Sequence, residues 1–116
     1  MPQTIFIETD SLPREASAYG RFVEILNDRL AGAKNVVGTL RWLDSGAVFT
    51  ADTDDTHQLL YLMEGHGSIR LENQSHDVRE GMGVYLGPSE HATIQAASDT
   101  TIKLLHLVVP PIPTQV

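Results

Sequence analysis

The stretch FTADTDDTHQLLYLMEGHG, Phe49 to Gly67, joins a polar segment directly to an apolar run. Aspartates and threonines crowd the first half, and the apolar residues begin immediately after His57 and Gln58. Successive side chains of a β-strand point to opposite faces, so His57 and Gln58 should not serve the same cavity. Both faces of this strand are then largely apolar, which indicates that one lines the interior and the other packs on a second sheet or a second subunit. The pattern therefore favours a homodimer.

The composition is that of one folded domain. The chain has 116 residues, of which 41% are hydrophobic and 20% charged, and this length suits one hydrophobic core better than two. The formal net charge of -7 is spread along the chain, whereas a nucleic-acid-binding surface needs clustered Lys and Arg. The sequence contains no cysteine, so disulfides and thiolate ligands are excluded. Any metal ion would need nitrogen and oxygen ligands.

The sequence carries no signal for membrane insertion or export. Its longest apolar runs, such as LLHLVV, are far shorter than the ~20 residues that a membrane-spanning helix needs. The segment MPQTIFIETD has neither the basic leader nor the apolar stretch of a secretory signal. We therefore expect a cytoplasmic protein with neither membrane nor nucleic acid as a partner.

Short apolar runs separated by turn residues predict an all-β fold. From Val36 onward, runs rich in Val, Ile, Leu, Thr and Tyr alternate with turn segments such as DSG, ENQS and GPSE, as in a sandwich or barrel. The expected strands are Val36–Leu43, Ala47–Ala51, His57–Met63, Ser68–Leu71, Gly83–Leu86, His91–Ala96 and Thr101–Val109. In the N-terminal third, TIFIE and RFVEIL are expected as strands and LPREASAY as a loop or one helical turn. The prolines of PPIPTQV should end the last strand near Val109, because proline has no N–H for the sheet.

Two groups of residues resemble the paired motifs of the cupin superfamily. The first motif of that family is Gly, five residues, His-X-His, three or four residues, Glu, six residues and Gly. The matching positions here are Gly46, Asp52, Asp54, Gln58 and Gly65. The second motif is matched by Gly81, by GPSEH with one residue fewer in its turn, and by His91 and Gln95. The resemblance implies a small single-domain cupin, a double-stranded β-helix or jelly-roll barrel over residues 32–111. Residues 1–31 would add N-terminal strands and a loop, and residues 112–116 a tail.

The resemblance also implies a divalent metal ion inside the barrel. Cupins bind it through the histidines and glutamate of the two motifs, which correspond here to Asp52, Asp54, Gln58 and His91. Only His91 keeps the residue of the family. Carboxylate, amide and imidazole ligands could hold Mn, Fe, Zn or Ni, and a cation would relieve the repulsion between two neighbouring aspartates. The alternative is an exposed polar turn, in which Asp and Thr side chains bond their own backbone.

The other histidines carry different expectations. His57 could replace a missing ligand if the strand shifts its register by one residue. His106 shares a strand face with Leu104, which is typical of a hydrogen-bonded core histidine, although a cavity position would also suit it as an acid or base. His66 is expected in a solvated turn and His76 on the surface.

Two functions suit this pattern. The first is a metal-dependent enzyme, such as an isomerase or lyase, that acts on a small polar metabolite in the barrel. Its metal ligands would be Asp54, His57, Gln58 and His91, and its catalytic residues Asp52 and His106. The alternative is a non-catalytic cupin that binds a small molecule without metal, for instance as a sensor. A purely structural dimer is a third possibility, because the fold alone does not choose an activity. No role is assigned to Arg41, Trp42, Tyr85 or Glu90.

Overall fold

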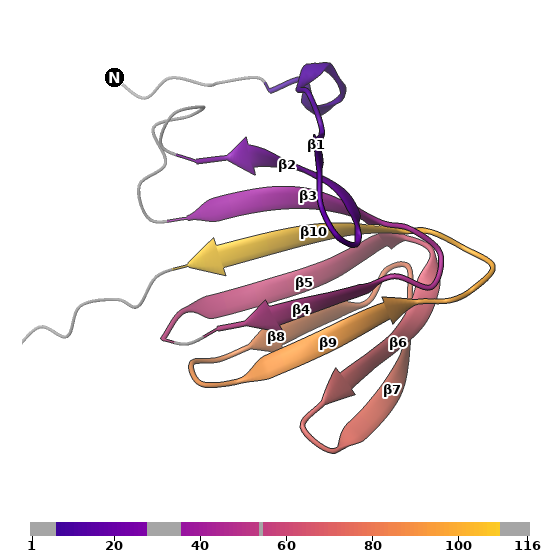
Figure 1. Cartoon of the computed structure of the whole chain (residues 1–116). Helices are drawn as coiled ribbons and strands as arrows, with labels where there is room; N and C mark the ends of the chain where they lie inside the picture. Colours follow the sequence, from indigo (N-terminus) through magenta and orange to yellow (C-terminus); the bar gives the residue numbers. More distant parts are fainter. Residues whose placement is uncertain (1–6, 28–35, 54, 110–116) are drawn as a thin grey trace, which may run out of the picture.

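The protein is a sandwich of two antiparallel β-sheets (Figure 1). The computed structural model describes residues 7–27, 36–53 and 55–109. Their elements are η1 (Thr9–Ser11), β1 (Glu15–Ala16), β2 (Gly20–Leu26), β3 (Val37–Leu43), β4 (Val48–Asp52), β5 (His57–Glu64), β6 (His66–Leu71), β7 (Gln74–Arg79), β8 (Gly83–Leu86), β9 (His91–Ala96) and β10 (Ile102–Val109). The strand order is β1-β2-β3-β10-β5-β8 in the larger sheet and β4-β9-β6-β7 in the smaller one. This arrangement confirms the predicted all-β jelly roll.

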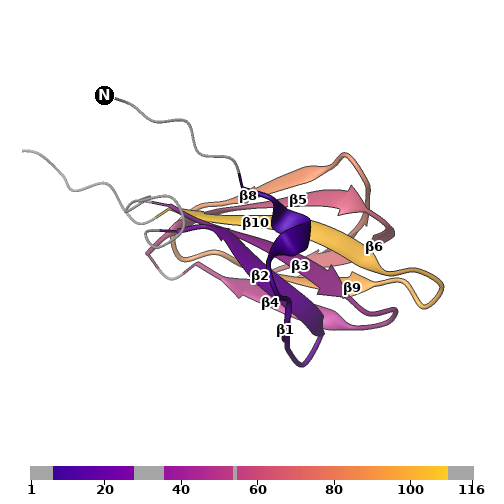
Figure 2. The same cartoon turned by 90° about the horizontal axis from the view of Figure 1, so that it is seen from above.

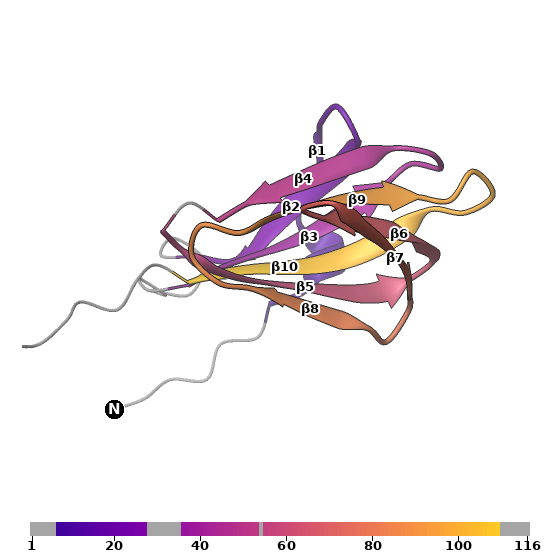
Figure 3. The same cartoon turned by 90° about the horizontal axis from the view of Figure 1, so that it is seen from below.

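The two sheets face each other and enclose the core. Seen from below, the smaller sheet lies against the larger one, with β4 and β7 at its edges (Figure 3). The larger sheet carries two additional strands at its N-terminal edge, where η1 and β1 lie beside β2 (Figure 2). The last strand, β10, lies between β3 and β5 in the middle of the larger sheet.

Alternating side chains build the core from both sheets. In β5 the side chains of Gln58, Leu60 and Leu62 are buried, while the residues between them are more exposed. This confirms the predicted division of the strand into two faces. Strand β9 shows the same alternation, and its Ile94 is completely buried. The buried polar side chains of the described residues are Thr39, Thr53, Gln58 and His106, and the last two belong to the candidate site.

Some elements differ from the sequence-based expectation. Strand β7 is not predicted, because in QSHDVR only Val78 is buried and no apolar alternation marks the strand. His66 is the first residue of β6 instead of a turn residue, although its side chain is exposed. The segment RFVEIL lies in β2 as expected. Most of the expected strand TIFIE and the proline-rich tail lie outside the described residues. No helix in the described part of the chain is long and apolar enough to cross a membrane.

Candidate functional site

The candidate residues predicted from sequence gather at one end of the sandwich but face different surfaces. Asp52 ends β4, His57 and Gln58 begin β5, and His91 begins β9, all at the same end of the molecule (Figure 1). Asp52 and His91 are paired neighbours across the two strands, and both side chains are exposed. Gln58 and His106 are instead buried. The candidates thus fall into an inner and an outer group.

Gln58 and His106 form the buried centre of a hydrogen-bonded network. Arg41 Nε donates to His106 Nδ1 over 3.0 Å. Because Nδ1 is the acceptor, Nε2 carries the imidazole proton and donates to Gln58 Oε1, 2.6 Å away. His106 is therefore a hydrogen-bonded core histidine, as its strand face predicts.

The network extends in both directions from this pair. On one side, Arg41 Nη1 donates to the Tyr19 hydroxyl over 2.6 Å. On the other, Gln58 Nε2 donates to the Asp52 carbonyl oxygen at 3.0 Å and to Thr56 Oγ1 at 3.1 Å. One chain of hydrogen bonds thus joins the N-terminal edge of the larger sheet to the polar segment before β5. Each bond has a consistent donor and acceptor, so the buried amide and imidazole are both satisfied.

The protonation state of His106 follows from its surroundings. Burial lowers the pKa of His106, and the positive charge of Arg41 lowers it further, from 6.5 to about 4. The imidazole is therefore neutral at pH 7 and can accept the hydrogen bond from Arg41. It is a fixed donor towards Gln58 and does not titrate near neutrality, which is where an acid–base catalyst would be expected to titrate.

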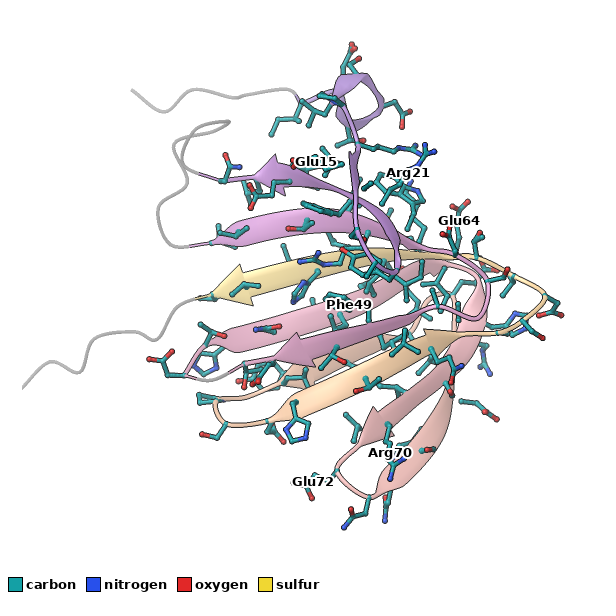
Figure 4. All side chains as sticks on the ribbon, viewed as in Figure 1. Glu15, Arg21, Phe49, Glu64, Arg70 and Glu72 are labelled. Carbon is teal, nitrogen blue, oxygen red and sulfur yellow. The ribbon has the colours of Figure 1, made fainter. Side chains whose placement is uncertain are left out.

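Aromatic rings surround the guanidinium of Arg41. Its central carbon lies 4.6 Å from the ring centroid of Phe49, 5.8 Å from that of Phe22 and 5.9 Å from that of Tyr19. Phe49 also meets His106 edge to face, with the centroids 5.4 Å apart, and it lies near the middle of the sandwich in Figure 4. A cation over ring faces is attracted by their quadrupoles. Arg41 is thus held in place by both rings and hydrogen bonds.

The sequence pattern misses three members of this site. Arg41 lies in VGTLRWL, which has apolar residues on both faces of the strand. Alternation therefore does not tell which face points inward. Tyr19 belongs to a segment between short elements, where no periodicity is available. Phe49 could have been found, because it alternates with Ala51 in β4 and both are buried.

One member of the outer group, His91, lines an open cavity, and His57 bonds a second residue that lines it. His57 Nδ1 and the Tyr85 hydroxyl are 2.6 Å apart and hydrogen-bonded, and the two rings are stacked. Tyr85 and His91 both line a cavity of about 510 Å³ between the β6–β7 turn and the β8–β9 loop. Its other lining residues include Glu72, His76, Leu86 and Glu90. The cavity therefore places His91 near Tyr85, the hydrogen-bond partner of His57. Gln58 does not line this cavity.

The described residues at the cupin ligand positions do not fit one metal centre. Asp52 and His91 expose their side chains on the outer face of the smaller sheet, and the inward-facing neighbour of His91 is Ala92. Gln58 points inward, and its amide oxygen already accepts a hydrogen bond. Asp54 lies outside the described residues. Within the described ranges, no group of three or more His, Asp or Glu residues could hold a metal ion.

Residues 39–112 match the family described as the AraC-like ligand binding domain. The chain belongs to this family. This membership confirms the resemblance to small cupins, since AraC-like ligand binding domains have a cupin-type fold. No curated protein sequence matches the chain.

Solved structures of several kinds are similar to this AraC-like domain. A predicted oxalate decarboxylase from Thermotoga maritima is 12% identical with a TM-score of 0.79, covering 92% of this chain and 100% of that chain. KdgF from Halomonas sp. is also 12% identical with a TM-score of 0.79, covering 95% of this chain and 96% of the other. A cupin protein from Bacteroides fragilis is 22% identical with a TM-score of 0.70, covering 90% and 89%. These similarities show the fold and leave the activity to the site.

Proposed function

We propose that this AraC-like domain binds a small polar molecule at the network of Tyr19, Arg41, His106 and Gln58, without a metal ion. The observation that carries the proposal is the chain of hydrogen bonds through the buried His106–Gln58 pair. Burying polar and charged groups costs free energy, and a core with only apolar packing at these positions would avoid that cost. A binding role accounts for keeping them, and membership in a ligand-binding family supports it.

The chemistry of the site suits recognition better than proton transfer. The N–H groups of Gln58 and His106 are engaged within the network, so these residues hold Arg41 in place, and Gln58 Oε1 can accept one further hydrogen bond from a ligand. Arg41 adds a permanent positive charge, and Phe49 adds an apolar ring beside it. A few fixed polar groups against apolar walls are typical of small-molecule sites. His106 stays neutral over the pH range in which a general base would need to exchange protons.

Ligand binding should depend on Gln58. The probe is a panel of small sugars, polyols, amino acids and hydroxy acids at millimolar concentration, read by thermal unfolding and then by calorimetry. A ligand at 100 times its Kd stabilises a protein by about 2.7 kcal/mol, which raises the Tm of a domain of this size by about 10 °C. We expect at least one compound to do so, and Gln58→Leu to weaken its binding at least tenfold.

The matched control is Gln95→Leu on β9, because Gln95 is exposed on the outer face of the smaller sheet. It removes the same amide without touching the network, so ligand binding should stay at the wild-type level. The proposal fails if no compound in the panel binds, or if Gln58→Leu and wild type bind equally well.

The metal-dependent isomerase or lyase is the second candidate, and it makes a different prediction. It would require Asp52 and His91 to reach the interior together, whereas both side chains are exposed in the observed register. Elemental mass spectrometry on protein purified without a metal-binding tag should find far less than one Mn, Fe, Zn or Ni per chain. It should also find no difference between wild type and His91→Ala. Near-stoichiometric metal that disappears in His91→Ala would instead support the enzyme.

The homodimer and the cytoplasmic location stay predictions. The outer face of β5 supports the dimer, because Tyr61 and Met63 are each 38% exposed there beside the half-buried Leu59. Large apolar side chains gathered on one sheet face are typical of contact surfaces between subunits.

A further inference from the structure

The guanidinium of Arg41 has unused hydrogen-bonding capacity. An arginine side chain offers five N–H donors, and the network uses one on Nε and one on Nη1. Among the described residues, Ser17 Oγ is the sole buried side-chain polar atom without a hydrogen-bond partner. No acceptor for the Nη2 group of Arg41 is found among the described residues, so its N–H groups are available to a bound molecule.

The positive charge of Arg41 also has no counter-ion in the part of the chain that the structure describes. Within residues 7–27, 36–53 and 55–109, no carboxylate makes an ion pair with it, and the ion pair present joins His66 to Asp99 instead. This is unexpected in a chain with 15 Asp and Glu against 8 Lys and Arg. The neighbours of the guanidinium are neutral: the imidazole of His106, the Tyr19 hydroxyl and the rings of Phe22 and Phe49. A partly buried cation without a partner is costly, and an anion that binds beside it would offset the cost.

The arrangement favours a planar anion with two oxygens. Guanidinium and carboxylate match as two parallel N–H···O bonds, and such pairs are stronger than bonds between neutral groups. With Nε and one Nη1 hydrogen already engaged, the pair of nitrogens Nη1 and Nη2 presents the free edge. The contacts with Tyr19 and Phe49 restrict its rotation, so little conformational entropy is lost when a ligand binds.

We propose that the ligand of this domain carries a carboxylate group and that Arg41 binds this group through its free edge. The inference rests on the proposed function and specifies its ligand class: a small organic acid instead of a neutral sugar or polyol. Tyr19 acts as a positioning residue, because its hydroxyl and ring orient the guanidinium. The rest of the ligand would lie beside Phe49, towards His106 and Gln58.

The test compares acids with amides of the same shape. Lactate and lactamide form one pair and benzoate and benzamide another, each titrated by calorimetry at pH 7.5 and constant ionic strength. Chloride and inorganic phosphate are included to detect binding of any anion regardless of shape. We expect the acid of at least one pair to bind ten times or more tightly than its amide, and more tightly than chloride or phosphate.

The variants assign the preference to Arg41. Arg41→Gln should remove the acid–amide difference, and Arg41→Lys should keep part of it, because the charge stays while the planar fork is lost. The control is Arg21→Gln on β2, an exposed arginine labelled in Figure 4, which should bind acids as wild type does. If Arg41→Gln does not fold, the loss of affinity in Arg41→Lys decides the question.

The outcomes separate this inference from the function on which it rests. If neutral compounds bind in a Gln58-dependent manner and no acid is preferred, the carboxylate inference is overturned and the binding function stands. If acids are preferred equally by wild type and Arg41→Lys, Arg41 is not the anchor and the inference also fails. If nothing in either panel binds, both proposals are wrong.

Discussion

Acidification from pH 7 to pH 4 is expected to lower the free energy of unfolding by about 3 kcal/mol through His106 alone. The pKa of His106 is about 4 in the folded protein and 6.5 in an unfolded chain. Between these values the unfolded chain takes up a proton that the folded protein excludes, so protonation favours unfolding. The stability that the neutral His106 imidazole contributes is fully present above pH 6.5 and is lost as the pH falls towards 4.

Denaturant unfolding measured at half-unit intervals from pH 7 to pH 4 tests this expectation. Carboxylates also titrate at the acidic end, so the informative quantity is the difference between wild type and His106→Gln, which keeps a polar side chain but cannot titrate. Wild type should lose stability more steeply than His106→Gln across this range. The control is His76→Gln in β7, whose side chain is exposed, and it should follow wild type. Parallel curves for wild type and His106→Gln would show that the imidazole is not held neutral.

Gly65→Ala is expected to destabilise the fold by more than about 4 kcal/mol, the range reached by only a few kinds of point substitution. Gly65 joins β5 to β6 with φ +91°, and a Cβ atom there would lie 2.1 Å from the carbonyl oxygen of Thr101. The position of the Cβ atom is fixed by the backbone of residue 65 and the oxygen belongs to the main chain of Thr101, so no side-chain rotation can relieve the clash. The substitution would push the β5–β6 turn away from the beginning of β10.

Gly81→Ala separates the clash from the backbone strain. Gly81 has nearly the same φ, +90°, but a Cβ atom there would meet nothing within 4 Å. Its substitution should cost only the left-handed conformation, about 1–3 kcal/mol. Chemical denaturation of both variants gives the comparison. Equal losses of stability in the two variants would mean that the carbonyl oxygen of Thr101 lies farther than 2.1 Å from a Cβ atom at position 65.

Local periodicity was sufficient to predict most of the sheet and one half of the site. Alternation in β5 predicted that His57 and Gln58 lie on opposite faces, and the structure shows Gln58 to be the buried one. Alternation in β10 indicated a core position for His106, which is buried. Both predictions depend only on neighbours along one strand. The same signal failed for β7, whose side chains are nearly all exposed. A strand with so little buried surface leaves almost no hydrophobic pattern to detect.

The other half of the site depends on distances that no local pattern encodes. The bond between Arg41 and His106 spans 65 residues of sequence, and it exists because β3 pairs with β10. The directions of Asp52 and His91 depend likewise on the register between β4 and β9, and a slip of one residue would reverse them. Motif spacing alone suggested a metal centre at these positions. Pairing between distant strands determined which side chains share a space.

The central place of β10 has a consequence for synthesis on the ribosome. Because β10 lies between β3 and β5, these two strands have no common neighbour until the chain has been translated past Val109. Until then both present unpaired edges, which are prone to associate with other chains. The domain should therefore fold only after its last strand leaves the exit tunnel, and a ribosome that stalls before His106 would hold a nascent chain with neither a closed larger sheet nor a binding site.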